Sequence, residues 1–187
     1  MNALENWYCS TSFWRWMTRE RLLPWLLGGA SLGEQLLEIG AGAGAATAAL
    51  RKRVPHVVSL EYDRGFATKL AHQNGLGAGV VQGDAAALPF TGRSFSSVIA
   101  ILALHHLRSS EQQDRAFREI HRVLRPGGQF FAFEIPDGWL HRLVHTRSTF
   151  VPVHPQRIAA RLRNIGFADV TLDLRPGGFR FRASRNG

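Results

Sequence analysis

Cysteine is almost absent from this sequence, because Cys9 is the only one among 187 residues. One cysteine cannot form a disulfide within the chain or supply a cysteine-based zinc site. Such scarcity suits a reducing compartment, so we expect a cytoplasmic protein. No apolar run approaches the ~18 residues that a membrane span needs, and the N-terminus shows no basic start followed by an apolar segment. We therefore expect no membrane span.

Acidic residues are also scarce. The chain has 14 Asp and Glu against 23 Lys and Arg, which gives a formal net charge of +9. Such an excess is compatible with a nucleic-acid or anionic-lipid partner, or with an arginine-rich solvent-exposed surface. The arginines are spread along the chain without a recognised nucleic-acid-binding module, so we expect no nucleic-acid partner. The oligomeric state is left open.

Metal-ligand patterns are poor as well. His141 and His145 stand four residues apart, as on a zinc-binding helix, and His154 follows them. Because no matching set of acids or cysteines accompanies these histidines, we expect no metal site.

Apolar residues are abundant enough for one core. A hydrophobic content of 45% over 187 residues suits a single domain. We expect that domain to cover the whole chain. Its predicted parts are an aromatic helical segment or lid at 1–32, a cofactor-binding core at 33–135, an insertion at 136–154, and a helix with a hairpin at 155–187.

A glycine-rich stretch, LLEIGAGAG at residues 36–44, organises the rest of the chain. An apolar strand runs into glycines and then into an expected helix over 45–53, which is how α/β domains build nucleotide pockets. Gly40 allows a turn at positive φ, and Gly42 lets the backbone approach a ligand. Gly40, Gly42 and Ala45 also match the G-x-G-x-x-A dinucleotide fingerprint. The stretch therefore predicts a bound cofactor without choosing among nucleotides.

The second expected strand, residues 57–61, ends in an acid. Glu61 lies 21 residues after Gly40, where a carboxylate can accept both hydroxyls of a ribose. Asp63, two residues further on, is expected to cap the helix over 65–72.

Later strands also end in polar residues. Residues 79–82 lead into Asp84, and residues 97–102 are continuously apolar, as expected of a parallel strand buried on both faces. Ligands bind at the carboxyl ends of the strands in open α/β sheets. The polar residues at the ends of the fourth and fifth strands are His105, His106 and Glu134.

Helices and a hairpin complete the chain. Ser110 and Gln113 have capping-box spacing at the start of one helix, and residues 155–165 predict another. Apolar residues alternate over 170–174 and 179–183 on either side of a Pro-Gly-Gly turn, which predicts a β-hairpin. Five β/α units followed by a hairpin predict an α/β fold with an open, twisted sheet and helices on both faces.

Aromatic residues crowd the first thirty positions. Trp7, Tyr8 and Trp14 precede the first strand, and Phe13 with Trp14 can form one side of a helix that Pro24 would end or bend. This segment either packs on the sheet or covers the site as a lid against substrate, and the sequence leaves both open.

With these motifs in order, the chain resembles the class I S-adenosylmethionine-dependent methyltransferases, in the small-molecule and quinone-pathway branch (methyltransferase type 11). The likeness covers roughly residues 33 to 184. Its motifs are the glycine stretch, Glu61, Gly83-Asp84 with LPF at 88–90, LHHL at 104–107 and RVLRPGG at 122–128. The terminal hairpin matches the antiparallel strand that distinguishes this seven-stranded, three-layer, Rossmann-like fold from dinucleotide-binding domains.

The resemblance implies S-adenosylmethionine as cofactor and S-adenosylhomocysteine as product. Glu38 would orient the amino group of the methionine part. The residues that would lie along that part are Gly40, Ala41, Gly42, Gly44, Ala100 and Ile101.

For the adenosine part, the resemblance implies that Glu61 would hold the ribose hydroxyls and Tyr62 would lie against the adenine. Asp84 would accept from the exocyclic amine, and Ala85 would offer its backbone N–H. Glu61 stands where Asp is commoner, and the longer side chain can do the same job.

Methyl transfer from a sulfonium is an in-line displacement, so the main tasks are to align the acceptor and exclude water. His105, His106 and Glu134 are candidates for a general base, with a structural role for the histidines as the alternative. We expect a small-molecule acceptor whose reacting atom is unidentified. The competing hypotheses are an NAD-dependent oxidoreductase and a non-catalytic cofactor-binding module.

Overall fold

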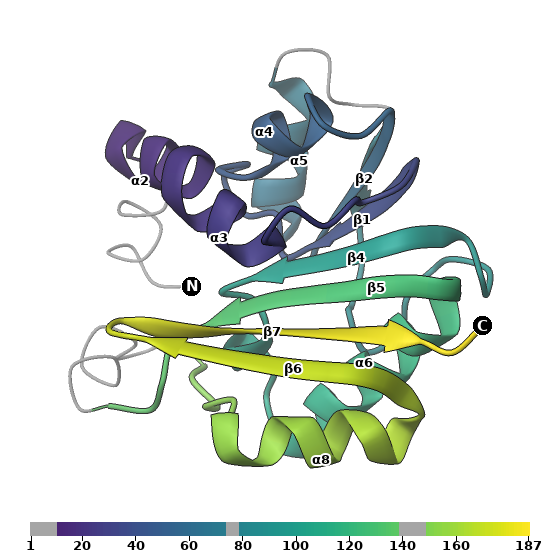
Figure 1. The fold of residues 1–187 in the computed structure, drawn as a ribbon. Helices are drawn as coiled ribbons and strands as arrows, with labels where there is room; N and C mark the ends of the chain where they lie inside the picture. Colours follow the sequence, from purple (N-terminus) through teal and green to yellow (C-terminus); the bar gives the residue numbers. More distant parts are fainter. Residues whose placement is uncertain (1–10, 74–78, 139–148) are drawn as a thin grey trace.

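The computed structural model describes residues 11–73, 79–138 and 149–187. Its sheet has seven strands in the order β3-β2-β1-β4-β5-β7-β6, and Figure 1 shows β2, β1, β4, β5, β7 and β6 side by side in that order. Neighbouring strands from β3 to β5 pair in parallel, whereas β7 runs antiparallel to both β5 and β6. The predicted α/β sheet with a terminal hairpin is therefore confirmed. The strands are β1 Gln35–Ile39, β2 His56–Glu61, β3 Val80–Gln82, β4 Phe95–Ile101, β5 Leu124–Glu134, β6 Phe167–Arg175 and β7 Gly178–Arg185.

Helices cover both faces of the sheet (Figure 1). One face carries α4 (Thr47–Arg51), α5 (Arg64–His72) and an N-terminal helical segment. The other face carries α6 (Ser110–Val123) and α8 (Pro155–Ile165). The N-terminal helical segment consists of α2 Ser12–Met17, the π-helical turn η1 Thr18–Leu22 and α3 Leu23–Leu27. Among the described residues, no helix is long and apolar enough to cross a membrane.

Adjacent strand residues contribute to two separate hydrophobic cores. Ile99 and Phe131 belong to the core beneath the N-terminal helical segment and α4, whereas Val98 and Phe130 belong to the core beneath α6 and α8. All four side chains are fully buried. Successive side chains of a strand point to opposite faces, so the central strands can be apolar throughout. Packing on both faces fixes the strand ends from which the site is built.

The sequence predicted that Pro24 would end or bend the N-terminal helix. The structure shows that the helical segment continues past Pro24. The proline lies in the first turn of α3, and the π-helical turn Thr18–Leu22 comes directly before it, where a wider turn accommodates the missing N–H. Trp14 is 7% exposed but Phe13 is 61% exposed. Trp14 therefore packs on the sheet and Phe13 does not, because neighbouring residues of a helix point about 100° apart.

Trp25 connects the N-terminal helical segment to the hairpin. Its indole N–H donates to Asp173 Oδ2 at 2.9 Å, and its ring lies edge-on to Phe133 with centroids 5.8 Å apart. The guanidinium groups of Arg175 and Arg180 lie 4.7 and 5.2 Å from the ring centroid. Arg180 also donates to the Trp25 carbonyl, one of the free carbonyls at the end of α3. These contacts hold the segment against the sheet.

Candidate functional site

The glycine stretch turns sharply at the carboxyl end of β1. Gly40 has φ 70°, and a Cβ there would lie 2.5 Å from the Cβ of Ala103, so both the backbone angle and the space require glycine. Gly42 also has a positive φ, but a Cβ on it would meet no atom within 4 Å. The backbone at Gly42 therefore borders open space. The helix that follows begins at Thr47, later than the predicted Ala45.

Glu61, the last residue of β2, lies beside the glycine turn. Its Oε2 accepts from the Gly42 N–H at 2.8 Å, and its Oε1 accepts from the Asp63 N–H at 2.9 Å. Asp63 caps α5 through a 3.0 Å bond from the Phe66 N–H, which confirms the predicted cap. The Glu61 carboxylate thus connects the end of β2 to the turn after β1.

Glu38 is buried below the same turn. Its Oε2 accepts from the hydroxyls of Thr47 and Ser59, each at 2.7 Å. Burial raises the pKa of the Glu38 carboxyl above its ordinary value of 4.5, although both hydroxyls favour the ionised form. A buried carboxylate at this position can attract a cation, because ion pairing offsets its loss of hydration.

Asp84 lies in a tight turn after β3. Its Oδ1 accepts from the Ala86 N–H at 2.8 Å, its carbonyl accepts from the Ala87 N–H at 3.0 Å, and its Oδ2 accepts from Gln112 Nε2 at 3.4 Å. Ala85 is part of this turn and is half-buried. The carboxylate is therefore oriented by its own turn and by the start of α6.

Gln112 is a site residue that the sequence prediction missed. The cap of α6 is Ser109, not the predicted Ser110, and its hydroxyl accepts from the Gln112 N–H. Gln112 Oε1 in turn accepts from the Arg108 N–H at 2.8 Å. The signal was the Ser-x-x-Gln spacing, which also fits residues 109–112, one position earlier than predicted.

Tyr62 and Arg108 meet above the end of β1. Arg108 Nη2 lies 3.3 Å from the Tyr62 hydroxyl oxygen, although Tyr62 follows β2 and Arg108 follows β4, the two neighbours of β1. Tyr62 is 61% exposed. This pair borders the site on its solvent side, and the predicted contact of Tyr62 with adenine stays a prediction.

The end of β4 is largely buried, and the predicted contact of Ala100 and Ile101 with the methionine part stays a prediction. Ala100 is fully buried and is the pairing partner of Ile39 in β1. Ile101 is half-buried. Leu102 follows in the left-handed region with φ 53°, an unfavourable conformation for a side chain with a Cβ. No local pattern predicts this backbone conformation, which turns the chain sharply beside the glycine stretch.

His105, in η3 (Leu104–His106), and Glu134, at the end of β5, form a buried pair. His105 Nδ1 lies 2.6 Å from Glu134 Oε2, and the side chains are 2% and 0% exposed. Glu134 Oε1 accepts from the Leu104 N–H at 2.8 Å. The His106 ring packs against His105 in a tilted arrangement with centroids 4.2 Å apart, and its Nδ1 lies 3.2 Å from the Thr149 carbonyl. Two of the three candidate bases, His105 and Glu134, are thus hydrogen-bonded to each other.

Other predicted residues lie elsewhere. Trp14 belongs to the core beneath the N-terminal helical segment, whereas Trp7 and Tyr8 are outside the described residues, so the lid stays a prediction. His141 and His145 are also outside them. Within the described ranges, no group of three His, Cys, Asp or Glu side chains is arranged to hold a metal ion.

Solved methyltransferase structures have this fold. Phosphoethanolamine N-methyltransferase 2 of Haemonchus contortus, in complex with S-adenosyl-L-methionine, matches with a TM-score of 0.77 at 15% identity over 92% of this chain and 53% of that one. An S-adenosylmethionine-dependent methyltransferase of Thermotoga maritima matches with a TM-score of 0.71 at 16% identity over the full length of both chains. At these identities the similarity shows the fold.

Sequence relatives are also methyltransferases. Demethylmenaquinone methyltransferase of Corynebacterium kroppenstedtii is 31% identical over 123 residues, which cover 66% of this chain and 48% of the relative. Sterol 24-C-methyltransferase of Gibberella zeae is 38% identical over 112 residues, 57% of this chain and 29% of the relative. The chain thus spans less than half the length of these curated relatives.

The family model of the methyltransferase domain matches residues 37–132, which is about half of the chain. The matched region runs from β1 to β5 and includes the glycine stretch, Glu61 and Asp84. On these grounds the chain belongs to the methyltransferase domain family.

Proposed function

We propose that this protein transfers a methyl group from S-adenosylmethionine to a small-molecule acceptor. The observation that carries the proposal is the Glu61 carboxylate, which is hydrogen-bonded to the Gly42 N–H of a glycine turn that borders open space. Glu38 lies below this turn. Asp84 follows β3, which is the neighbour of β2 in the sheet. The site residues inferred from the sequence remain part of this proposal, as does their grouping in a single domain.

The charge of these three residues supports a cationic cofactor. Carboxylates can pair with an ammonium group and a sulfonium, and they accept hydrogen bonds from ribose hydroxyls and an adenine amine. The diphosphate of NAD would instead meet negative side chains at the glycine turn, and like charges repel. The three carboxylates therefore fit S-adenosylmethionine and disfavour the oxidoreductase alternative.

The bound cofactor would supply a methyl group already activated by the positive sulfur. In this proposal, Glu61 and Asp84 hold the ribose and the adenine, and Glu38 orients the amino group. The N-terminal helical segment and the residues after β5 would form the acceptor side. The chain's task is then to align the acceptor with the methyl group and to exclude water.

We further propose that His105 accepts a proton when the acceptor is a hydroxyl or a thiol. Its Nδ1 lies 2.6 Å from Glu134 Oε2. A carboxylate can only accept a hydrogen bond, so in this proposal Nδ1 carries the proton and Nε2 is the basic nitrogen. Glu134 is then a positioning residue that acts through His105.

The acceptor is proposed to be a small apolar molecule, because the names of the sequence relatives refer to demethylmenaquinone and sterol substrates. A methyl-transfer screen over quinones, phenols, sterols and small amines would identify it. Activity confined to small amines would contradict the apolar acceptor.

Binding of the cofactor product tests the proposed function directly. We expect S-adenosylhomocysteine to bind measurably in calorimetry at neutral pH and NAD to give no heat of binding, because the three carboxylates disfavour a diphosphate. Binding of NAD without binding of S-adenosylhomocysteine would overturn the assignment. Binding without transfer to any acceptor in the screen would favour a non-catalytic module.

Glu38→Gln is expected to stabilise the protein and to weaken cofactor binding. Burial raises the pKa of the Glu38 carboxyl, so the folded protein retains a proton that the unfolded chain has lost. The free energy of unfolding therefore falls as pH rises from the unfolded value near 4.5 through the higher folded pKa. Glutamine does not ionise, so the variant keeps the free energy of unfolding that the wild type loses. Each kcal/mol kept at neutral pH raises the melting temperature by about 2 to 4 °C.

Binding should change in the opposite direction. Loss of a charged partner for the ammonium group is expected to raise the dissociation constant of S-adenosylhomocysteine about tenfold, or ~1.4 kcal/mol. Thermal unfolding and calorimetry on the same samples measure both effects. Glu34→Gln, an exposed change just before β1, is the matched control and should alter neither. A destabilised Glu38→Gln with normal affinity would contradict this role.

A further inference from the structure

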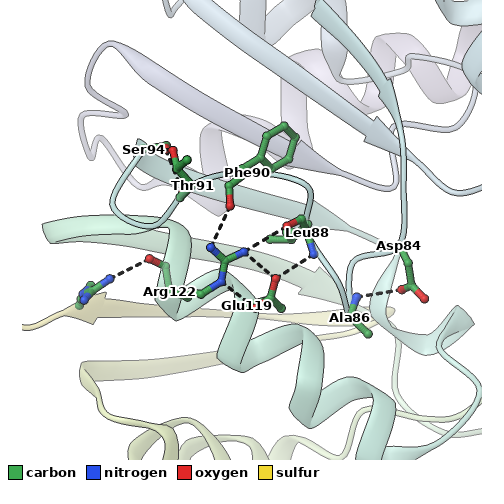
Figure 2. Close-up of polar contacts among 9 residues, drawn as sticks. Asp84, Ala86, Leu88, Phe90, Thr91, Ser94, Glu119 and Arg122 are labelled. Atoms are coloured by element: carbon green, nitrogen blue, oxygen red, sulfur yellow. Dashed lines mark hydrogen bonds and ion pairs between the residues drawn. The ribbon is translucent and has the colours of Figure 1, made fainter.

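Two side chains of α6 hold the turn that follows Asp84 (Figure 2). Arg122 donates from Nε and Nη2 to the two carboxylate oxygens of Glu119, each at 2.7 Å. The same guanidinium donates from Nη1 to the Phe90 carbonyl at 2.8 Å and from Nη2 to the Leu88 carbonyl at 3.1 Å. Glu119 Oε2 accepts from the Leu88 N–H at 2.8 Å. We call Arg122 and Glu119 the α6 clamp, because together they hold both backbone groups of Leu88.

Leu88, the residue held by the α6 clamp, is closely connected to Asp84. Asp84 accepts from the backbone N–H of Ala87, the residue directly before Leu88. A Cβ on Gly83 would lie 2.8 Å from Leu60 Cδ1 and 3.5 Å from Pro89 Cδ, so the clamped segment packs back against the residue before Asp84. A displacement of Leu88 would therefore move the turn that carries the Asp84 carboxylate.

The base of the clamp is also fixed. Arg185 of β7 donates from Nη1 to the carbonyls of His121, Arg122 and Leu124 at 2.8, 3.0 and 2.8 Å. These carbonyls belong to the last turn of α6 and to its C-cap Leu124, and carbonyls at a helix end lack partners within the helix. The Arg93 N–H donates to the Arg122 carbonyl as well, at 3.0 Å. The Arg122 side chain thus projects from a backbone that is held by two other segments.

The exposure of the pair limits its contribution to global stability. The Arg122 and Glu119 side chains are 41% and 21% exposed, and ion pairs at such positions usually add little to the free energy of unfolding. The hydrogen bonds from Arg122 lower the pKa of the Glu119 carboxyl, so it is ionised at neutral pH. The planar guanidinium can satisfy a carboxylate and two carbonyls at once, a geometry that lysine cannot reproduce.

We propose that Arg122 and Glu119 are positioning residues for the adenine end of the cofactor, acting through Leu88 on the carboxylate of Asp84. The inference rests on the proposed function, in which Asp84 accepts from the adenine amine. The clamp lets one side of the α/β sheet, through α6, set the position of a loop that binds a ligand. Gln112, at the start of the same helix, holds the other Asp84 oxygen, so α6 orients the adenine site at both of its ends.

The test compares S-adenosylhomocysteine affinity in matched variants of the full chain. Arg122→Ala is expected to raise the dissociation constant about tenfold, since small misplacements of a binding group have large effects. Arg122→Lys should give an intermediate value, because it keeps the charge but not the fork. Arg118→Ala removes an exposed arginine one turn earlier on α6, with no hydrogen bond to the described residues 84–94, and should bind as the wild type does. Melting temperatures measured on the same samples show whether each variant is folded.

A double-mutant cycle with Asp84→Ala separates positioning from a structural role. If the clamp acts through Asp84, then Arg122→Ala should add less than about a twofold loss of affinity in the Asp84→Ala background. Equal losses in both backgrounds would overturn the inference, as would wild-type affinity in Arg122→Ala and Arg122→Lys. Absence of binding by the wild type would overturn the proposed function and this inference together, so the two failures are distinguishable.

Discussion

Glu134→Ala is expected to lower the free energy of unfolding by about 3 to 5 kcal/mol. The carboxylate accepts from the Leu104 N–H at 2.8 Å and lies 2.6 Å from His105 Nδ1, and its side chain is fully buried. Removing it leaves two buried donors without their acceptor, and each such donor costs about 1 to 3 kcal/mol. Single domains have only about 5 to 15 kcal/mol of stability in total. Urea unfolding followed by tryptophan fluorescence measures the loss.

Glu134→Gln is the matched variant, because its carbonyl oxygen can still accept from the Leu104 N–H. We expect it to fold with a much smaller loss of stability. Its amide N–H₂ would face His105 Nδ1, which must then accept rather than donate, so the ring proton moves to Nε2. If His105 is the base, methyl transfer to a hydroxyl acceptor should fall by about 100-fold or more. A stable glutamine variant with wild-type transfer would restrict the pair to a structural role.

Much of the fold could be predicted because its signals are local. The alternation around the Pro-Gly-Gly turn predicted the β6–β7 hairpin, and the continuously apolar run of β4 predicted a central strand buried on both faces. The spacing from Gly40 to Glu61 predicted an acid that holds a ribose. The 2.8 Å bond to the Gly42 N–H places this acid beside the glycine turn, and the ribose contact stays a prediction. Such patterns depend on hydrophobic periodicity and on the backbone preferences of single residues, and both can be read from a short stretch of sequence.

Partners that are distant in sequence could not be predicted in this way. Nothing near Leu88 indicates that Arg122 would hold its carbonyl, because that contact depends on how α6 packs against the sheet. The same holds for Trp25, whose indole bonds to Asp173 across 148 positions. Burial also depends on where a strand lies in the sheet. Leu174 has the alternation of a buried strand but is 60% exposed, because β6 is the edge strand of the sheet.

Glu61→Ala and Asp84→Ala are each expected to weaken S-adenosylhomocysteine binding by about 1 to 3 kcal/mol, or roughly 5- to 150-fold in the dissociation constant. Each variant leaves polar groups of the ligand without a partner. The stability of the free protein should change less, because the N–H groups that Glu61 and Asp84 accept from lie in partly exposed turns, where water can replace the carboxylate.

Asp63→Ala gives the reverse pattern and is the matched control. Its carboxylate caps α5 through the Phe66 N–H at 3.0 Å, and loss of such a cap costs about 1 kcal/mol of stability. Asp63 is only two residues from Glu61, yet in the proposed site it does not touch the cofactor, so its affinity should equal that of the wild type. Calorimetry and thermal unfolding on all three variants decide the matter. If Glu61→Ala and Asp84→Ala bind normally but unfold easily, as expected of Asp63→Ala, then these acids are structural and the proposed cofactor site is wrong.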